Sequence, residues 1–485
     1  MEDVQKETSS AASLRRLAIG LVLVYVAAVV LFYFLAGEQL HLRQSRGNLP
    51  MPAAESGTVE LAQGAVIEQV FTAEIQRLQM VSVQWGTYYR PNAGTVTMEL
   101  WNGGTGRLLL SQSYDVAAIE EGGAITLTAE TPLEGLCGVP LLLRIYADSQ
   151  PGSAASPLMN QSAPAAEGFA LSLNGVPTAG TLCFAASGQD YIWTGLHYWE
   201  FAAAFGLLLI VLLLVVRMRY RQGKHSYLVN ALAAVSKYRF LIRQLVSRDF
   251  KTKYKRSILG VFWSFLNPLL TMLVQYLVFS TIFKSDIPNF AAYLILGTVM
   301  FNFFGEACGM TLNSILGNAS LITKVYIPKY IYPLTRTMSS AVNLLISLAP
   351  LLIVCLATGV TFQKSAVLAL YFFACLIIFS LGLGMLLATS MVFFRDTQFL
   401  WNVLNMIWMY ATPIFYPETI LPDRFRMVLQ LNPLYHFLKN ARMCILDGLS
   451  PEPAVYVQCL MIALGMLLVG AFVFYRNQDK FVLYL

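Results

Sequence analysis

The residues whose side chains could perform acid–base or nucleophilic chemistry are scattered along this chain. Asp249, Asp286, Glu306 and Asp396 stand singly in or beside apolar stretches, without the second carboxylate that a paired acid–base site needs. No histidine accompanies a nucleophile and an orienting carboxylate, and neither G-x-S-x-G nor H-E-x-x-H occurs. The sequence therefore predicts no catalytic residue. Glu306 is a candidate functional group because a carboxylate inside an apolar span is costly.

Metal and nucleotide sites are not predicted either. The seven cysteines lack paired C-x-x-C spacing, and there are only four histidines. The motif G-x-x-x-x-G-K-[ST], whose backbone amides and lysine hold nucleotide phosphates, does not occur. We therefore expect no metal and no directly bound cofactor. If this protein works with ATP and Mg²⁺, another chain must bind them.

Four aromatic residues near one another in sequence have the chemistry to stack on sugar rings: Trp85, Tyr88, Tyr89 and Trp101. Trp85 and Trp101 fall in alternating stretches typical of strands, which favours a core position for both. The Tyr88-Tyr89-Arg90 segment lies between such stretches and is the better candidate for a glycan contact.

Composition places the chain in a membrane. Hydrophobic residues make up 56% and charged residues 12%, whereas soluble domains carry about 25% charged residues. The mean hydropathy is +0.59. The net charge of +6 does not call for nucleic acid, because the cations flank apolar runs, as they do at the cytoplasmic ends of spans.

The N-terminal part predicts a helix pair around an outside segment. Residues 1–16 are polar, and residues 17–36 form an uncharged run that we interpret as an uncleaved transmembrane helix. A signal peptide is the alternative, although the run is longer than the usual 7–15 apolar residues. A second transmembrane helix is predicted over 197–216, followed by a basic linker over 217–235. Because both helices have basic and therefore cytoplasmic ends, the segment between them lies outside.

Residues 57–190 predict an extracytoplasmic all-β sandwich. Short alternating stretches bounded by Gly, Asn and Pro are typical of half-buried strands; they are Gln79–Trp85, Thr95–Trp101, Leu141–Tyr146 and Phe169–Leu173. Gln150–Glu167, rich in Ala, Ser and Pro, is predicted to be a long loop. Cys137 and Cys183 either form a disulfide in an oxidising compartment or remain two buried thiols.

A basic stretch then leads into further apolar runs. Residues 236–250 have apolar positions near the helical period, which predicts an amphipathic helix in the membrane interface. Six spans follow within 258–485: Ile258–Phe283, Ala291–Leu312, Met338–Thr358, Ser365–Phe394, Thr397–Phe415 and Ala454–Tyr475. The fold class is thus a polytopic α-helical membrane protein of eight spans with both termini cytoplasmic. Four cations on the outside depart from this topology: Arg424, Arg426, Lys439 and Arg442.

Five motifs in order resemble one transporter family. K-Y-K-R-S-I-L-G-V-F-W with N-P-L-L opens the series, and N-A-S-L-I-T-K-V-Y-I-P-K, F-F-R-D, T-P-I-F-Y-P and L-N-P-L-Y-H-F follow. Together they resemble the membrane subunit of ABC transporters that export O-antigen and teichoic acid. The resemblance runs from about Ser236 to the C-terminus, so the N-terminal helix pair and the β-domain depart from the family.

The resemblance implies which residues meet an ATPase subunit. The loop at Asn318–Pro333 carries an apolar face, and an exposed apolar patch is a docking surface. By resemblance, this loop inserts into the nucleotide-binding subunit, and the end of the amphipathic helix borders that subunit. The alternative is that the loop lies along the membrane surface. The predicted coupling residues are Leu321, Ile322, Lys324, Tyr326, Pro328, Arg248, Asp249 and Phe250.

The resemblance also implies an aromatic-lined channel, for which we predict Trp263, Tyr276, Trp401 and Trp408. Aromatic residues in spans also face lipid or neighbouring helices. The polar but partly apolar segment after Thr397–Phe415 is predicted to form short external helices with a turn at Asn432-Pro433. Its gate residues are Pro413, Tyr416, Pro417, Asn432 and Pro433, and a plain surface hairpin is the alternative.

The expected protein is therefore a homodimeric permease in the bacterial cytoplasmic membrane. Its partners are a separate ATPase subunit, membrane lipids and a lipid-linked polysaccharide or polyol-phosphate polymer. A membrane-anchored glycan-binding or surface-recruitment protein is the alternative, although two spans would suffice for it. A membrane-embedded glycosyltransferase would need clustered acidic residues, which this sequence lacks.

Overall fold

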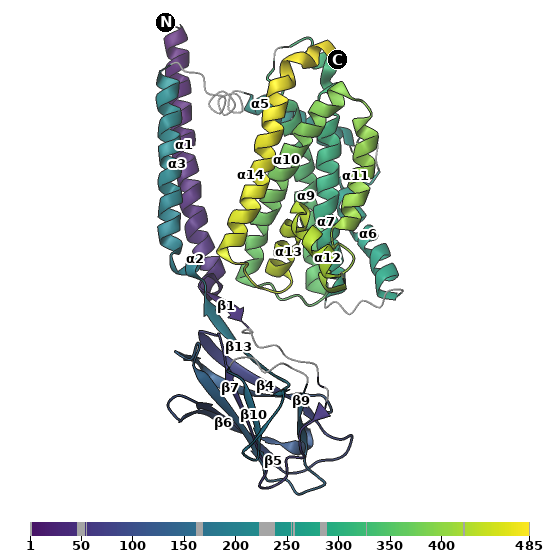
Figure 1. Cartoon of the computed structure of the whole chain (residues 1–485). Helices are drawn as coiled ribbons and strands as arrows, with labels where there is room; N and C mark the ends of the chain where they lie inside the picture. Colours follow the sequence, from purple (N-terminus) through teal and green to yellow (C-terminus); the bar gives the residue numbers. More distant parts are fainter. Residues whose placement is uncertain are drawn as a thin grey trace. The chain divides into compact units, whose positions relative to one another are not determined.

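The computed structural model describes residues 2–45, 54, 56–161, 168–222, 238–253, 255, 258–281, 289–325, 327–420 and 422–484. The chain divides into two compact units (Figure 1). His41–Leu196 forms the β-domain, which begins sixteen residues before the predicted start at residue 57 because an extra strand joins it. Met1–Leu40 and His197–Leu485 form the helical unit.

Two sheets of antiparallel strands build the β-domain. One sheet has the order β1-β13-β4-β9-β12, with β2 beside β9 and β7 beside β4, and the other has the order β11-β10-β3-β8-β5-β6. The strands are β1 Leu42–Ser45, β2 Ser56–Gly57, β3 Val66–Thr72, β4 Arg77–Gly86, β5 Thr95–Asn102, β6 Arg107–Asp115, β7 Ala124–Glu134, β8 Pro140–Ala147, β9 Ser156–Asn160, β10 Ala170–Leu173, β11 Val176–Thr178, β12 Thr181–Leu182 and β13 Phe184–Tyr191.

Alternation along these strands creates one apolar core. Every second residue of β3 and β8 is buried, because successive side chains of a strand point to opposite faces of its sheet. Phe71 of β3 and Phe184 of β13 come from different sheets and meet with ring centroids 5.0 Å apart. The four predicted strand stretches are all present, and Trp85 is buried in this core as expected, with 1% of its surface exposed.

One prediction about the β-domain is wrong, and neither of the two alternatives for its cysteines holds. Gln150–Glu167 is not a continuous loop, because β9 occupies part of it and buries most of its residues between β4 and β12; residues 162–167 lie outside the described residues. No disulfide joins Cys137 and Cys183 among the described cysteines. Cys137 is exposed in the turn after β7, whereas Cys183 is buried between β12 and β13.

The helical unit begins with a helix pair. α1 (Glu2–Ala36) contains the predicted span together with the polar N-terminal residues, and α3 (Tyr198–Arg221) follows the short α2 (Trp193–Leu196). Tyr25 donates its hydroxyl hydrogen to the carbonyl of Ala202 at 2.6 Å, and Tyr198 donates to the carbonyl of Val29 at 2.7 Å. These two bonds and close packing at Gly206 pair α1 with α3.

The remaining helices form a bundle (Figure 1). They are α5 Arg239–Lys253, α6 Phe262–Thr281, α7 Phe290–Leu312, α8 Ala319–Ile322, α9 Ile331–Ala357, α10 Ala369–Phe393, α11 Thr397–Ala411, α12 Asp423–Gln430, α13 Pro433–Ile445, α14 Pro453–Asn477 and α15 Phe481–Tyr484. Short 3₁₀ turns join several of them, including η3 Leu316–Asn318 and η4 Lys364–Leu368. α9 begins seven residues before the predicted span at Met338, because Pro333 sits in its first turn, where a proline is tolerated.

Seven helices in the described part of the chain are long and apolar enough to cross a membrane. They correspond to seven of the eight predicted spans. The eighth, α11, ends at Ala411, where Pro413 follows, and its 15 residues give a helix of roughly 22 Å. A hydrocarbon core is about 30 Å thick, so α11 is shorter than the predicted span Thr397–Phe415.

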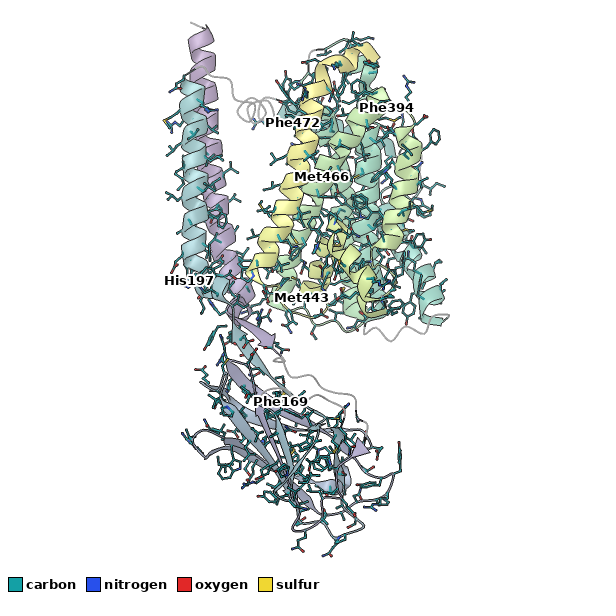
Figure 2. The ribbon with its side chains drawn as sticks, viewed as in Figure 1. Phe169, His197, Phe394, Met443, Met466 and Phe472 are labelled. Atoms are coloured by element: carbon teal, nitrogen blue, oxygen red, sulfur yellow. The ribbon has the colours of Figure 1, made fainter. Side chains whose placement is uncertain are left out.

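Two glycines let α10 and α14 pack with their backbones in contact. A Cβ built on Gly470 of α14 would lie 1.9 Å from the carbonyl oxygen of Gly382 on α10. Met466, one turn earlier on α14, is labelled in Figure 2 and packs against the bundle core. Close approach at small residues is the usual way in which helices associate in a membrane.

Candidate functional site

Three helices of the helical unit form a polar face. Asn267 of α6, Asn302 of α7 and Ser340 of α9 line one cavity of about 250 Å³, with Trp263 beside them. Polar side chains recur at helical spacing on each helix; they are Ser264 and Asn267 on α6, Asn302 and Glu306 on α7, and Ser340, Asn343 and Ser347 on α9. We call this set the polar face. Hydroxyl and amide groups at membrane depth usually mark a polar path or a helix contact.

Glu306 lies where the polar face meets α5. Lys253, at the end of α5, forms an ion pair with its carboxylate at 3.0 Å, and Asn343 of α9 donates a hydrogen bond to it at 2.6 Å. The Glu306 side chain is 29% exposed, so it keeps some contact with the cavity. The Glu306 carboxylate thus joins α5, α7 and α9. Its charge is paired with that of Lys253.

A second cavity of about 710 Å³ shares Lys253 and Glu306 with the first. Asp249 of α5 lies in its wall with a side chain only 4% exposed. Arg248 is 2.9 Å from one carboxylate oxygen of Asp249, and Arg336 of α9 is 3.2 Å from the other. Arg248 also donates to Asn318 at 3.3 Å. These contacts tie α5 both to α9 and to the start of the loop predicted to meet an ATPase.

The amphipathic pattern of α5 is present in the structure. Ile242 and Leu245 are buried and pack against Ile331 of α9, while Phe240 on another face is 69% exposed. Phe250 is half-buried. α5 spans Arg239–Lys253 and so ends three residues beyond the predicted helix over 236–250.

The structure corrects the predicted coupling loop in part. Leu321 and Ile322 are half-buried against a cluster that contains Tyr332 and Phe474, so they do not form an exposed apolar face. Lys324 is exposed and Val325 is 48% exposed, which moves the accessible surface to the end of α8. Pro328 is half-buried. Tyr326 lies outside the described residues.

The four aromatics predicted to line a channel separate into two pairs. Trp263 is 45% exposed and lines the smaller cavity, and Tyr276 is 39% exposed on α6. Trp401 is buried, with its ring centroid 5.8 Å from that of Phe304. Trp408 also packs on Phe304, at 5.1 Å. The buried position of Trp401 contradicts the prediction for that residue, whereas Trp408 is half-buried at the edge of the core, and its channel role stays a prediction.

Trp408 instead supports the segment predicted to be a gate. Its indole nitrogen donates to the side-chain oxygen of Asn432 at 2.8 Å, and that oxygen also accepts from the backbone N–H of Leu434 at 3.0 Å. Asn432 is therefore the N-cap of α13, with Pro433 in the first turn. The predicted turn at Asn432-Pro433 between two short helices is confirmed.

The T-P-I-F-Y-P segment is fixed by a buried arginine. Arg442 of α13 donates to the carbonyls of Pro413 at 2.6 Å, Ile414 at 3.0 Å and Tyr293 at 3.0 Å. Its guanidinium carbon lies 3.3 Å from the centroid of the Tyr293 ring, a cation–π geometry. The Tyr293 hydroxyl donates to the Tyr416 carbonyl at 2.9 Å. Pro413 is buried and Pro417 is half-buried, so this segment is a packed part of the bundle.

Burial lowers the pKa of Arg442 to about 10, which still leaves it charged at neutral pH. It was one of the four external cations that departed from the predicted topology. A buried cation that donates hydrogen bonds to backbone carbonyls has a structural role. Its position is therefore poor evidence about which side of the membrane this segment lies on. Lys439 likewise pairs with Glu418 at 2.9 Å.

In the β-domain, Tyr88 and Tyr89 form an exposed turn between β4 and β5. Trp101 is half-buried, and the guanidinium of Arg144 lies 5.6 Å from its ring centroid. Trp85 and Trp101 therefore do not join the two tyrosines in a shared aromatic surface.

Sequence reasoning missed most of the polar face. Arg336, Ser340, Asn343 and Ser347 are spaced four, three and four residues apart, which places them on one face of a helix. Thr298, Asn302 and Glu306 repeat every four residues in α7. The sequence therefore contained a pattern that could have predicted the polar face, namely polar residues at helical spacing inside apolar spans. Arg442 gave no such signal, because its role depends on carbonyls far away in sequence.

The chain is similar to known transport proteins over its C-terminal half. Residues 241–446 match the family model described as ABC-2 type transporter, from within α5 to the end of α13. Over 234 residues the chain is 28% identical to the O-antigen export system permease protein RfbA of Klebsiella pneumoniae, covering 48% of this chain and 85% of that protein. It is 27% identical to RfbA of Myxococcus xanthus, covering 52% and 98%.

A more distant similarity reaches the polysialic acid transport protein KpsM of Escherichia coli, at 22% identity over 50% of this chain and 95% of that protein. The family match contains most of α5, the polar face and the segment fixed by Arg442. It does not include α1, α3 or the β-domain.

Proposed function

We propose that this protein is the membrane subunit of an ATP-driven exporter. Its cargo is a lipid-linked polysaccharide or polyol-phosphate polymer, moved outward across the cytoplasmic membrane. Residues 241–446 match the model of the ABC-2 type transporter family, and the same half of the chain is similar to proteins named as O-antigen export permeases and as a polysialic acid transport protein. The observation that carries this proposal is the match of the family model and of three polysaccharide-transport relatives to the same half of the chain.

The polar face is the part of the bundle suited to the cargo. Asn267 and Asn302 are exposed at the surface of the helical unit although they lie within candidate spans. Polar side chains at this depth face a bundle interior or a water-filled cavity much more often than lipid. Two copies of the chain that bring these faces together would enclose a hydrated path, with Trp263 at its side and the Lys253–Glu306 pair at one end.

The ATPase is a separate subunit in this proposal, and it binds the end with α5 and α8. Exposed Lys324 and Val325 provide its contact. The ion pairs of Asp249 with Arg248 and Arg336 would pass a movement of α5 to α9, because a buried carboxylate does not readily give up its partners. In this orientation both chain termini are cytoplasmic and the β-domain is extracytoplasmic.

The experiment is co-purification from the native membrane, with ATPase activity measured in the eluate. We expect wild-type protein to bring down an ATPase subunit, and Val325→Asp to lower the recovered activity roughly tenfold, as expected when a contact residue of an interface is lost. Leu449→Asp is the matched control, because Leu449 is 40% exposed in the loop after α13. Its eluate should keep wild-type activity.

Surface polysaccharide is measured in the same strains. Recovery of pure protein without an ATPase, in cells whose surface polysaccharide is unchanged by deletion of the gene, would exclude an exporter. The protein would then be a membrane-anchored glycan-binding or recruitment protein.

A further inference from the structure

Two consecutive tyrosines in the β-domain adopt a backbone conformation that bulky residues avoid. Tyr88 has a φ of 57° and Tyr89 a φ of 53°. This left-handed region is favourable for glycine and uncommon for other residues, especially large ones. Strained residues persist only where their surroundings fix them, and they concentrate at ligand-binding and other functional sites. The turn between β4 and β5 is therefore held in this shape by specific contacts.

Glu121, next to the start of β7, provides the first set of contacts. Its carboxylate accepts hydrogen bonds from the backbone N–H and the hydroxyl of Thr87, both at 2.6 Å, and from the N–H of Tyr89 at 3.4 Å. The hydrogen bonds from Thr87 lower the pKa of Glu121, so the carboxylate stays charged at neutral pH. One side chain thus fixes both ends of the strained turn.

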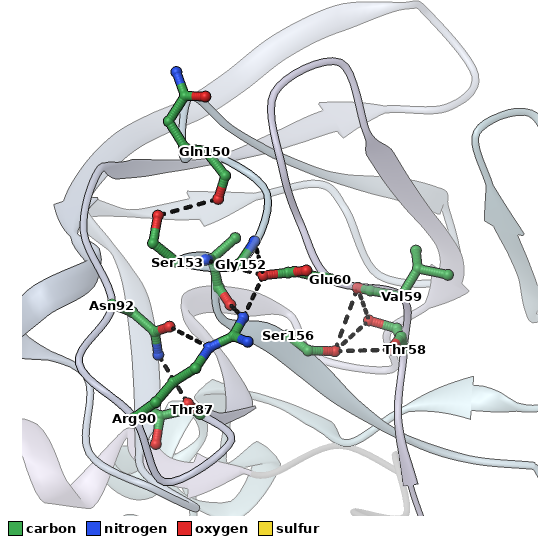
Figure 3. A network of polar contacts seen from close by, with 11 residues as sticks. Thr58, Val59, Glu60, Thr87, Arg90, Asn92, Gln150, Gly152, Ser153 and Ser156 are labelled. Atoms are coloured by element: carbon green, nitrogen blue, oxygen red, sulfur yellow. Dashed lines mark hydrogen bonds and ion pairs between the residues drawn. The ribbon is translucent and has the colours of Figure 1, made fainter.

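Arg90 provides the second set of contacts, shown in Figure 3. Its guanidinium pairs with Glu60 and donates to the carbonyl of Ala154 at 3.2 Å and to Asn92 at 3.3 Å. Asn92 in turn donates to the carbonyl of Thr87 at 2.9 Å. This network anchors the turn to the loop before β9, far away in sequence.

The two tyrosines consequently differ in what they can contact. The guanidinium carbon of Arg90 lies 4.9 Å from the Tyr88 ring centroid, so one face of Tyr88 is occupied by its own domain. Tyr89 is 89% exposed. An exposed tyrosine on a fixed backbone is an efficient contact residue, because the backbone loses little conformational entropy when a ligand packs on the ring.

We propose that Tyr89 is the stacking contact of a glycan-binding site on the β-domain, with Tyr88 and Arg90 as its supporting residues. This inference depends on the proposed function, since it assigns the site to the exported polysaccharide. The surroundings favour a sugar over a protein partner. Thr87 and Asn92 are buried beneath the turn, so the polar groups at its surface are the guanidinium of Arg90 and the carboxylate of Glu121. The centre of a protein interface is usually a wider apolar patch. A sugar ring needs one aromatic face for its C–H groups and polar neighbours for its hydroxyls.

The test uses the full-length protein in detergent and oligosaccharides cut from the surface polysaccharide of the native organism. The oligosaccharides are immobilised, and affinity is measured by surface plasmon resonance. We expect Tyr89→Ala to weaken binding roughly threefold to tenfold, the range of a single aromatic contact. Tyr89→Phe should bind nearly as well as wild type, because it keeps the ring. Tyr191→Ala removes a tyrosine that is 41% exposed elsewhere in the β-domain and should have no effect.

A second variant, Glu121→Gln, tests the rigid turn. It removes the charge that accepts three hydrogen bonds, so binding should weaken although Tyr89 is intact. Wild-type protein that binds no oligosaccharide, or a Tyr89→Ala protein that binds as wild type does, would overturn the inference. A Tyr89→Ala protein that loses binding to a surface protein instead would assign the site to that partner.

Failure of this inference can be distinguished from failure of the proposed function. Val325→Asp should lower the recovered ATPase activity roughly tenfold and leave oligosaccharide binding unchanged. Tyr89→Ala should weaken oligosaccharide binding and leave co-purification of the ATPase unchanged. If both variants bind oligosaccharide as wild type does, and wild type still co-purifies with the ATPase, the proposed exporter function stands and only the proposed glycan-binding site is excluded.

Discussion

Arg442 shows at the level of single residues how a charge can serve structure. It is a buried cation whose side chain meets three carbonyl oxygens and an aromatic ring. Burying an unpaired charge is costly unless hydrogen bonds replace those of water, and three carbonyls with a ring face supply them here. The planar guanidinium suits this arrangement because it can donate in several directions and stack at the same time.

Replacing Arg442 should therefore loosen the segment from Pro413 to Tyr416. Arg442→Met leaves three buried carbonyls without their donor, and we expect a loss of at least about 2 kcal/mol in the stability of the detergent-solubilised protein. The stability of Arg442→Lys should lie between those of wild type and Arg442→Met, because an ammonium group keeps the charge but has no plane that can stack on the Tyr293 ring. Thermal unfolding is the measurement, with exposed Arg424→Met as control. Equal stability of Arg442→Met and wild type would show that the segment is held by other contacts.

At the level of helices, the bundle depends on how closely neighbouring helices approach. α10 and α14 make the most extensive contact of the described elements, and Gly382 and Gly470 lie at its centre. A methyl group at either position has no room, because backbone atoms of the opposite helix occupy it. Backbone atoms cannot rotate away as a flexible side chain can.

We therefore expect Gly470→Ala to destabilise the helical unit by about 1–3 kcal/mol, the usual cost of overpacking a core. Gly465→Ala on the same helix is the matched control, because a Cβ there meets nothing within 4 Å. Alanine also favours a helix over glycine, so the control should be neutral or slightly stabilising. Thermal unfolding in detergent compares the two. The same melting temperature for both variants would mean that α10 and α14 separate easily.

The whole molecule consists of two units with separate cores. The buried residues of the β-domain form one cluster of their own, built from both sheets. The family match lies wholly in the helical unit. The β-domain thus lies outside the part of the chain that matches the transporter family, with its own fold and, in our proposal, its own ligand.

Residues 41–196 should accordingly fold when produced alone. We expect a single cooperative thermal transition, measured by circular dichroism, and no shift of that transition on adding a reducing agent, because no disulfide joins Cys137 and Cys183 in the structure. A transition that falls by several degrees under reduction would show that Cys137 and Cys183 do form a disulfide. An aggregated or unfolded product would show that the β-domain needs the helical unit.

The sequence by itself determined the periodic features of this protein. Apolar runs of sufficient length indicated seven helices that the structure contains, and alternating stretches indicated strands β4, β5, β8 and β10. Five short motifs indicated the transporter family, which the match over residues 241–446 supports. These features are local, because hydropathy, alternation and short motifs each depend on neighbouring residues.

Only the tertiary structure decided which side chains meet. It placed Trp401 in the core, packed Leu321 and Ile322 of the coupling loop half-buried against the bundle, and paired Glu306 with Lys253. It also joined Arg442 to carbonyls that are 28 to 149 residues away in sequence. Such contacts depend on how helices are rotated and packed against one another, and the side chains of neighbouring helices settle that rotation together. A pattern within one segment cannot specify it.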